Sequence, residues 1–321
     1  MTWALTPATT IRLATGRYTQ SPGYEKLFQG DYFVDLSTAD NLRLLSERST
    51  HAIAGLEHTL SPAVSARVEA YYKRFTRMIA GRLETPVEAA ARVAQYAFPS
   101  DVASSVPTEA TITTIPDNSS SGRAYGVDFY LEKRPSSSLD RLTGWISYTV
   151  GTARLQNYGI TFPFDYDRRH SLSVVSTLRL TPSWSLGTTV RAASGFPFTL
   201  PVGLRVASTL APGAVSGAPG SLVPRRDPNG LYMWTVDYGG VDNLNRGRLP
   251  TYVRVDLRFT YERRASRWQL YFEVLNALNR DNAGSYTPRL EYAPGSDRPN
   301  LTLKPDGGLP LLPTLGLRVK F

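Results

Sequence analysis

Cysteine is absent from the 321-residue sequence, which excludes a disulfide scaffold and any thiolate metal site. The sequence also has no apolar run of the roughly 18 residues that a transmembrane helix requires. Its opening residues, MTWALTPATT, lack the basic and apolar regions and the cleavage site of a secretory signal. No GxSxG, GxGxxG, Walker A or HExxH motif is present. We therefore expect no enzymatic activity, and we assign no catalytic, cofactor-binding or metal-ligating residues.

Charge of either sign is modest. The sequence has 36 Lys and Arg against 27 Asp and Glu, a formal net charge of +9, and 41% of its residues are hydrophobic. That composition is too apolar for a disordered chain. The basic residues are dispersed among acidic ones, with no run of five or more. We therefore expect no nucleic-acid partner.

The most informative feature is an alternation of apolar and polar residues with a period of two. It is cleanest in residues 249–261, where odd positions such as Leu249 and Val255 are uncharged and even positions include Arg254 and Asp256. Successive side chains of a strand point to opposite faces, so this segment has one apolar and one charged face. A helix would scatter the same charges around its circumference. The pattern predicts a β-strand.

The same alternation recurs along the chain and predicts an all-β, antiparallel fold of about 11 strands. Tight turns rich in Pro, Ser and Thr alternate strictly with long connections. The predicted strands are residues 1–5, 10–18, 50–60, 64–80, 122–134, 140–153, 170–180, 184–194, 249–262, 268–277 and 309–321. The predicted long connections are residues 20–49, 82–121, 154–169, 195–248 and 278–308.

Two architectures explain strands with one apolar face. In a transmembrane up-and-down β-barrel the apolar face contacts lipid, and short periplasmic turns alternate with long extracellular loops. In a soluble β-sandwich, such as a carbohydrate-binding module, the apolar face packs in a core and gives the same alternation. Loops longer than about 12–15 residues are uncommon in compact soluble domains. The alternation of loop lengths therefore favours the barrel.

Five segments are distinctive, and four of them mark the entry to a strand or its end. FPFDYDRRH at 162–170 has the form of a loop that enters a strand, and RAASGFPFT at 191–199 has the form of a strand exit. The others are NRGRLPTYVRVDLR at 245–258, EVLNALNR at 273–280 and VEAYYKR at 68–74. Together these segments resemble the C-terminal β-barrel portion of the TonB-dependent receptors of the Gram-negative outer membrane.

The end of the sequence adds a second resemblance. The residues TLGLRVKF are similar to the terminal-strand signal that the barrel-assembly machinery reads. That signal has a polar residue, a glycine two positions later, and apolar positions alternating to a terminal aromatic residue. Here these positions are Thr314, Gly316, Val319 and Phe321.

The resemblance implies a location, a function and partners. It implies about half of a barrel of about 22 strands in the outer membrane, in contact with its lipid. The extracellular loops would capture a scarce solute such as a siderophore–metal complex, cobalamin or a glycan. Because residues 1–321 resemble neither the plug domain, the TonB box nor the signal peptide of the family, we interpret them as a partial barrel domain. Contact with the TonB complex would need a plug. A barrel for adhesion or structure, without transport, is the alternative.

A small cluster of ionisable residues stands where a predicted loop meets a strand. Asp165, Asp167 and His170 are close enough in sequence for a cation site. Arg168 and Arg169 lie between them and would neutralise the carboxylates locally. We favour ion pairing at the barrel rim over a metal site.

Three further groups have a structural and a functional interpretation. His51 and His58 are seven residues apart, on opposite faces of a strand, and we expect both to be structural. A stripe of charges on the polar face contacts a plug or solute, or forms salt bridges across neighbouring strands, which we favour. The stripe consists of Arg254, Asp256, Arg258 and Glu262. An aromatic group near the outer rim forms an interfacial girdle or, less favoured, stacks on a ligand; its members are Phe162, Phe164, Tyr166, Phe196 and Phe198.

Overall fold

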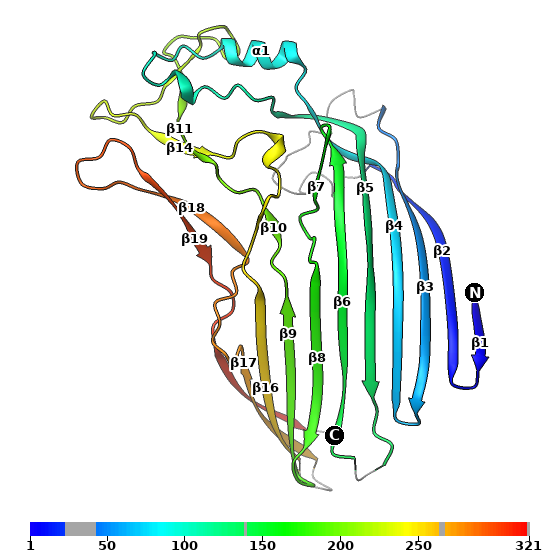
Figure 1. Ribbon diagram of the computed structural model, residues 1–321. Helices are drawn as coiled ribbons and strands as arrows, with labels where there is room; N and C mark the ends of the chain where they lie inside the picture. The colour runs from blue at the N-terminus through cyan, green and yellow to red at the C-terminus, as the bar shows by residue number, and fades with distance from the viewer. Residues whose placement is uncertain (23–42, 138–139, 263–266, 320–321) are drawn as a thin grey trace.

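The computed structural model describes residues 1–22, 43–137, 140–262 and 267–319, and most of them form one antiparallel sheet (Figure 1). Eleven strands follow one another in the order β1-β2-β3-β4-β5-β6-β8-β9-β16-β17-β20, and a twelfth, β7, pairs with β6 alone. Their bounds are β1 Thr2–Thr6, β2 Thr9–Gln20, β3 Glu47–Ser61, β4 Val64–Leu83, β5 Ile112–Lys133, β6 Leu142–Asn157, β7 Ile160–Pro163, β8 His170–Arg179, β9 Trp184–Ala193, β16 Tyr252–Glu262, β17 Trp268–Leu275 and β20 Leu312–Val319.

The eleven strands predicted from the alternation are all confirmed within the described residues, and the largest differences in their bounds lie at one end of the sheet. This end, which carries the long connections, is called the loop end below; the opposite end is the turn end. β5 begins at Ile112 instead of residue 122, and β6 runs on to Asn157. The added part of β5, ITTIPDNSSS, has no regular apolar alternation. Alternation is imposed only where one face meets an apolar medium, so strand outside that zone leaves no such pattern.

The extension of β6 returns through a tight hairpin that the sequence analysis placed inside a loop. Asn157 pairs with Ile160, which leaves a two-residue turn between β6 and β7. Tyr158 has φ 55° and Gly159 has φ 76°. Positive φ at both central positions is the geometry of a type I′ turn, whose twist matches that of the strands it joins.

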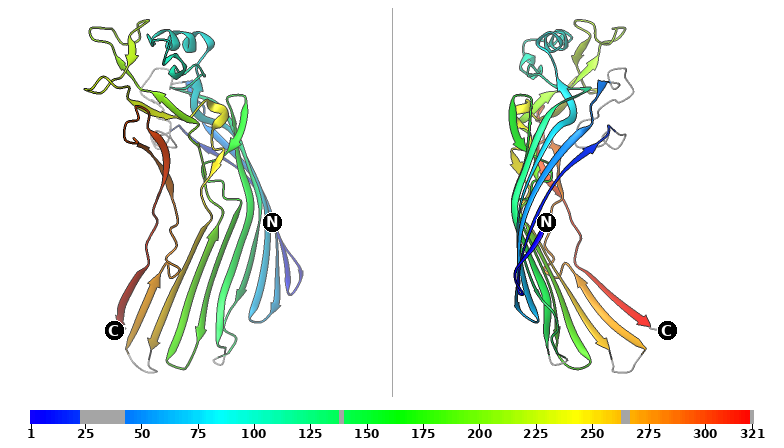
Figure 2. Two further views of the ribbon diagram at one scale, coloured as in Figure 1. Left: turned by 60° about the vertical axis from the view of Figure 1, so that its left-hand side comes forward. Right: turned by 90° about the vertical axis from the view of Figure 1, so that its right-hand side faces the viewer.

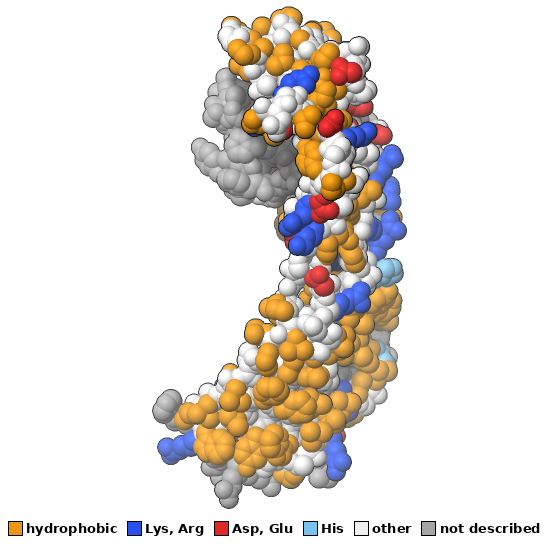
Figure 3. All heavy atoms as spheres, turned by 90° about the vertical axis from the view of Figure 1, so that its left-hand side faces the viewer, with side chains coloured by type: hydrophobic (Ala, Val, Ile, Leu, Met, Phe, Trp, Pro, Cys, Tyr) orange, Lys and Arg blue, Asp and Glu red, His pale blue; other side chains and the backbone are white. Residues whose placement is uncertain are grey.

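Cross-strand register brings the apolar positions of all eleven strands onto one face, called the outward face. One row aligns Val68, Phe129, Tyr148 and Leu172 across β4, β5, β6 and β8. Phe129 remains 43% exposed on this face. No described residue forms a second sheet or helix layer over it, and Figure 3 shows its hydrophobic side chains spread over the lower part of the sheet. The soluble sandwich considered above is therefore wrong.

The sheet is curved like a section of a barrel wall and is not closed (Figure 2). β1 and β20 are the two ends of the strand path, and among the described residues they do not pair with each other. The opposite, inward face carries polar and small residues. The Tyr71 hydroxyl, for example, lies over Gly126 and Gly151 of the neighbouring strands. One apolar and one polar face on an unlayered, curved sheet is the arrangement expected of an outer-membrane barrel wall.

The long connections contain secondary structure of their own, gathered at the loop end (Figure 1). No helix among the described residues has the length and apolar character needed to cross a membrane. The buried apolar side chains of the described residues all lie at or above the loop end; they are Val102, Ala193, Val206, Leu244 and Leu249. The elements are α1 Pro86–Ala94, the 3₁₀ turns η3 Ala103–Ser105 and η4 Val241–Asn243, and the strand pairs β10 Pro197–Phe198 with β15 Gly247–Arg248, β11 Gly203–Val206 with β14 Trp234–Asp237, β12 Ser208–Leu210 with β13 Leu222–Pro224, and β18 Ser285–Glu291 with β19 Asn300–Asp306.

Helix α1 begins with a capping box. The Thr85 hydroxyl accepts a hydrogen bond from the Glu88 amide at 3.3 Å, and the Glu88 carboxylate accepts one from the Thr85 amide at 2.9 Å. Arg82 also donates to both Glu88 oxygens. The hydrogen bonds from Arg82 and Thr85 hold the pKa of Glu88 at about 2, below its ordinary 4.5. The stabilisation they give is complete above pH 4.5 and is lost only as the pH falls towards 2.

We expect Thr85→Ala to loosen α1 without affecting the sheet. Loss of a helix N-cap costs about 1 kcal/mol, which corresponds to roughly fivefold faster hydrogen exchange of the α1 amides. Exchange measured by mass spectrometry on peptides that cover residues 86–94 checks this. Thr108→Ala is the matched control, because Thr108 is exposed and makes no side-chain hydrogen bond within the described chain. An equal effect of the two substitutions would contradict the capping role.

Candidate functional site

Three family-like segments meet at the loop end. The segment before β8, the exit from β9 and the entry to β16 are joined by the side chain of Arg248. Arg248 donates to the backbone oxygens of Asp167 at 2.8 Å and Gly195 at 3.2 Å, and forms an ion pair with the Asp167 carboxylate. The other Asp167 oxygen accepts from the Ala153 amide of β6 at 2.7 Å. With only 2% of Asp167 exposed, this buried pair fixes the three segments to one another.

Glycines allow the segments to approach this closely. A Cβ on Gly195 would collide with the Leu249 backbone, and a Cβ on Gly247 would lie 2.9 Å from the Phe198 ring. Phe198 pairs with Gly247 in the short β10–β15 ladder. The Ser-Gly-x-Pro-aromatic-Thr strand exit therefore has a glycine because another backbone lies directly against it.

Asn245 makes a second junction beside the first. It adopts φ 55°, a left-handed conformation that asparagine tolerates better than most residues. Its side-chain nitrogen donates to the Asp165 carboxylate at 2.6 Å and to the Pro163 carbonyl at 2.9 Å. Its amide donates to the Thr199 hydroxyl at 3.2 Å. The polar atoms in this corner are thus engaged in holding the loops.

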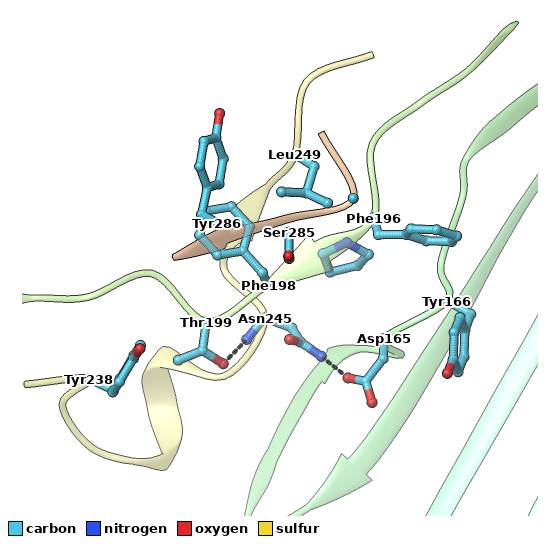
Figure 4. A pocket seen from close by; sticks show the side chains of 12 residues that line it. Asp165, Tyr166, Phe196, Phe198, Thr199, Tyr238, Asn245, Leu249, Ser285 and Tyr286 are labelled. Carbon is cyan, nitrogen blue, oxygen red and sulfur yellow. Dashed lines mark hydrogen bonds between the residues drawn. The ribbon is translucent and has the colours of Figure 1, made fainter. Parts of the chain in front are cut away.

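The second junction forms the floor of an open cavity of about 760 Å³ between the β10–β15 and β18–β19 pairs (Figure 4). Its wall is mainly aromatic and apolar, with few polar groups. Figure 4 shows Asn245 and Asp165 at its base, with Tyr286 and Phe198 on one side and Phe196 and Tyr166 on the other. The lining side chains that the figure labels are Asp165, Tyr166, Phe196, Phe198, Thr199, Tyr238, Asn245, Leu249, Ser285 and Tyr286.

A cation stacks on the aromatic group beside the cavity. The Arg168 guanidinium lies 3.9 Å from the Phe196 ring centre and 5.5 Å from that of Tyr252. Burial lowers the pKa of Arg168 below its ordinary value. Its Nε is buried and has no hydrogen-bond partner among the described residues. Cation–π contact of this kind is stronger when the cation is partly desolvated.

The structure separates the proposed Asp165–Asp167–His170 cluster. Asp165 bonds to Asn245, Asp167 pairs with Arg248, and the His170 ring lies 2.8 Å from the Tyr148 hydroxyl. Within the described chain, no group of three or more His, Cys, Asp or Glu side chains is placed to hold a metal ion. Ion pairing at the rim is present, but the expected partners Arg168 and Arg169 are wrong. The partner is Arg248, 81 residues away from Asp167 in sequence.

The other sequence-selected residues are placed as follows. His51 lies beside Ser49 at 2.6 Å and Tyr18, while His58 lies 2.8 Å from Thr9 on the other face. The aromatic group is connected through ring contacts: Phe164 with Tyr166, Tyr166 with Phe196, Phe198 with Tyr286 and Phe162 with Tyr158. Three of its members line the cavity, so ligand stacking remains open for them alongside a girdle role.

The charged stripe of β16 forms ion pairs on the inward face. Asp256 accepts from Arg254 at 2.7 Å and lies 3.7 Å from Arg191 of β9. The Arg258 guanidinium stacks 3.9 Å from the Tyr271 ring centre. Salt bridging, the interpretation we favoured, is thus present for Asp256. Glu262 accepts from Gln269 at 3.1 Å.

Asn276 and Asn282 have structural roles that the sequence analysis did not assign, although Asn276 lies in the EVLNALNR segment. Asn276 is 1% exposed, and its side chain donates to the carbonyls of Arg280 and Leu309. Asn282 both accepts from the Val253 amide and donates to the Val253 carbonyl, at 2.8 and 2.9 Å, as a neighbouring strand would. The repeated asparagines of EVLNALNRDN were the available signal, because asparagine side chains mimic backbone groups.

The residues of the terminal-strand signal lie on β20, except Phe321, which is outside the described residues. Gly316 is opposite Tyr271, whose ring occupies the space that a Cβ on Gly316 would need. Val319 is opposite Trp268 on the outward face. Thr314 is opposite Glu273 on the inward face. The glycine of the pattern is thus explained by packing.

Comparison with known proteins identifies the family. The model of the TonB dependent receptor-like β-barrel matches residues 1–277. No curated protein matches the sequence. The siderophore receptor PiuA from Acinetobacter baumannii has a TM-score of 0.57 at 11% identity, over 100% of this chain and 35% of that one. The ferric-catecholate import receptor Fiu from E. coli K12 has a TM-score of 0.56 at 12% sequence identity, over 100% of this chain and 34% of that one. The FrpB iron transporter from Neisseria meningitidis has a TM-score of 0.54 at 12% sequence identity, over 100% of this chain and 38% of that one.

At these low sequence identities, the structural similarity shows a common fold and no more. This chain spans about a third of the length of each of the three solved proteins. The family match, in contrast, covers most of the chain. The chain therefore belongs to the TonB-dependent receptor-like β-barrel family, whose members are Gram-negative outer-membrane transporters and not enzymes.

Proposed function

We propose that the protein takes part in the uptake of a scarce solute across the outer membrane, with a siderophore–metal complex as the first candidate and cobalamin or a glycan as the others. The observation that supports this most directly is the aromatic cavity at the loop end, which faces the cell exterior in this family. Its volume of about 760 Å³ lies in the range of small-molecule sites. The names of PiuA, Fiu and FrpB point to iron or siderophores.

The chemistry of the cavity suits a rigid, ring-bearing ligand. Tyr166, Phe196, Phe198 and Tyr286 offer ring faces for offset or edge-on stacking. Arg168 holds a fixed positive charge behind the Phe196 ring, and the whole chain carries a net charge of +9. An anionic metal chelate with aromatic groups would gain both ring contacts and electrostatic attraction.

The proposal extends to the domain and its partners. Residues 1–321 would act as one barrel-wall domain, because a continuous strand path runs from β1 to β20. Thr314, Gly316, Val319 and Phe321 would direct insertion by the barrel-assembly machinery. Energy for uptake would come from the TonB complex acting through a plug domain, which residues 1–321 do not resemble.

Tyr286→Ala is expected to weaken solute binding about tenfold or more, because it removes one stacking face of the cavity. A tenfold change corresponds to about 1.4 kcal/mol, the size expected of a ligand-stacking aromatic residue. Calorimetry on the purified protein in detergent, with a panel of ferric siderophores, cobalamin and oligosaccharides, measures it. Tyr292→Ala is the matched control, because Tyr292 lies in the same connection, is 55% exposed and does not line the cavity.

Uptake in cells distinguishes transport from the alternative function. Growth on the binding solute as the limiting nutrient should require both the protein and TonB. A protein that binds none of the panel and whose deletion leaves uptake of every member unchanged would instead support the adhesion or structural role.

A further inference from the structure

The outward face carries a row of arginines that the uptake proposal does not use. Register aligns Arg17 of β2 with Thr50, Thr50 with Arg74 of β4, Arg74 with Arg123 of β5, and Arg123 with Arg154 of β6. Counting in twos along each strand places these arginines on the outward face. The apolar side chains of the strands lie on the same face and are called the apolar belt below. In Figure 3, basic side chains gather at the edge of the sheet above the hydrophobic zone.

The arginine row has a defined position along the strands relative to the apolar belt. Tyr72 and Tyr125 are paired with each other two residues nearer the turn end, on the same face, and are both 47% exposed. Tyrosines exposed on the lipid face mark the membrane–water interface. Two residues of strand span about 6.6 Å. The arginines therefore lie one headgroup layer beyond the interface, on the side of the long loops.

The row lacks the ion pairs that other arginines of the sheet make. On the inward face, Arg12 lies 2.7 Å from Glu57 and Arg67 lies 3.7 Å from Glu69. In the described part of the chain, Arg17, Arg74, Arg123 and Arg154 have no carboxylate within ion-pair distance. The row consists of Arg17, Arg74 and Arg123, which are exposed, and Arg154, which is partly exposed.

Like charges opposite one another on neighbouring strands destabilise a sheet. Arg74, Arg123 and Arg154 occupy three adjacent strands about 4.8 Å apart. An anion that binds several of them at once would remove this repulsion. Guanidinium groups bind phosphate oxygens in pairs and keep their charge at any physiological pH.

We propose that Arg17, Arg74, Arg123 and Arg154 bind the phosphate groups of an outer-leaflet lipid, which in the Gram-negative outer membrane is lipopolysaccharide. The row is about 19 Å long, four strand spacings, so it favours a lipid with more than one phosphate over a lipid with a single phosphodiester. The Thr50 hydroxyl within the row adds a hydrogen-bonding group for the sugar. This site is on the lipid side of the wall and is independent of solute uptake.

The test replaces all four arginines with glutamine and measures the lipopolysaccharide that remains bound to protein purified from outer membranes. We expect at least a tenfold loss per mole of protein. The control is Arg141→Gln with Arg267→Gln, because both arginines are exposed and lie at the turn end of the sheet. That variant should retain its lipopolysaccharide. Heat-modifiable gel mobility verifies folding, and Arg74→Gln with Arg123→Gln replaces the quadruple variant if the latter does not fold.

Titration of delipidated protein separates the source of the phosphate. Binding should be tight for lipopolysaccharide and at least tenfold weaker for its dephosphorylated form, for phosphatidylglycerol and for inorganic phosphate. Equal binding of the dephosphorylated form would overturn the role of the phosphates. Equal binding of phosphatidylglycerol or of free phosphate would overturn the assignment to lipopolysaccharide, and so would undiminished lipopolysaccharide on the arginine variants.

Discussion

Asp167→Asn is expected to destabilise the loop end by about 3 kcal/mol, the lower end of the range for breaking a buried ion pair. The lower end applies because Arg248, its partner, keeps 27% of its side chain in contact with solvent. The amide retains the shape of the carboxylate but removes the charge that Arg248 neutralises. One of the two Asp167 carboxylate oxygens also becomes an NH₂ group, which cannot accept the hydrogen bond that this oxygen received from Ala153 or from Arg248.

The loss of the ion pair should loosen all three segments that Arg248 joins. Hydrogen exchange and protease cleavage within 162–170, 194–199 and 245–249 should increase, while the strands near the turn end stay protected. Asp165→Asn is the matched control, since Asp165 is exposed and makes one hydrogen bond, to Asn245 at 2.6 Å. We expect it to cost under about 1 kcal/mol. Equal losses for the two variants would show that the ion pair is not the main junction.

The strands were predictable because a strand that faces lipid on one side needs apolar residues at every second position. Along β16, the outward positions from Val253 to Phe259 are apolar and the inward positions from Arg254 to Glu262 are polar or charged, so period-two counting locates the strand with few errors. The same period-two pattern did not predict the strands that lie beyond the apolar zone of the sheet. β7 and the first part of β5 lie at the loop end, and their sequences show no regular apolar alternation that such counting could detect.

The site was less predictable because it depends on contacts between distant residues. Arg168 directly follows Asp167 in sequence, yet it lies just after a turn and stacks on the Phe196 ring instead of pairing with the Asp167 carboxylate. The true partner, Arg248, lies in a segment recognised only as a strand entry. The sequence singled out the motif segments, and the fold determines which of their residues meet.

Val255→Arg is the second substitution with a large expected effect, because it tests the medium on the outward face. Val255 lies opposite Val190 of β9, within the apolar belt. An arginine facing lipid near the bilayer midplane costs about 2–4 kcal/mol. We expect most of the variant protein to fail membrane assembly, measured as loss of the heat-modifiable folded band on gels of outer-membrane fractions.

Thr260→Arg introduces the same side chain on the same strand but on the other face. Thr260 lies between Ser185 of β9 and Tyr271 of β17, where Arg258 already stacks on the Tyr271 ring. The inward face is hydrated and tolerates charge, so this variant should assemble at close to the level of the unmodified protein. If instead both variants assembled equally well, lipid would not contact Val255. The apolar belt, the depth assigned to the arginine row and the placement of the cavity outside the membrane would all have to be abandoned together.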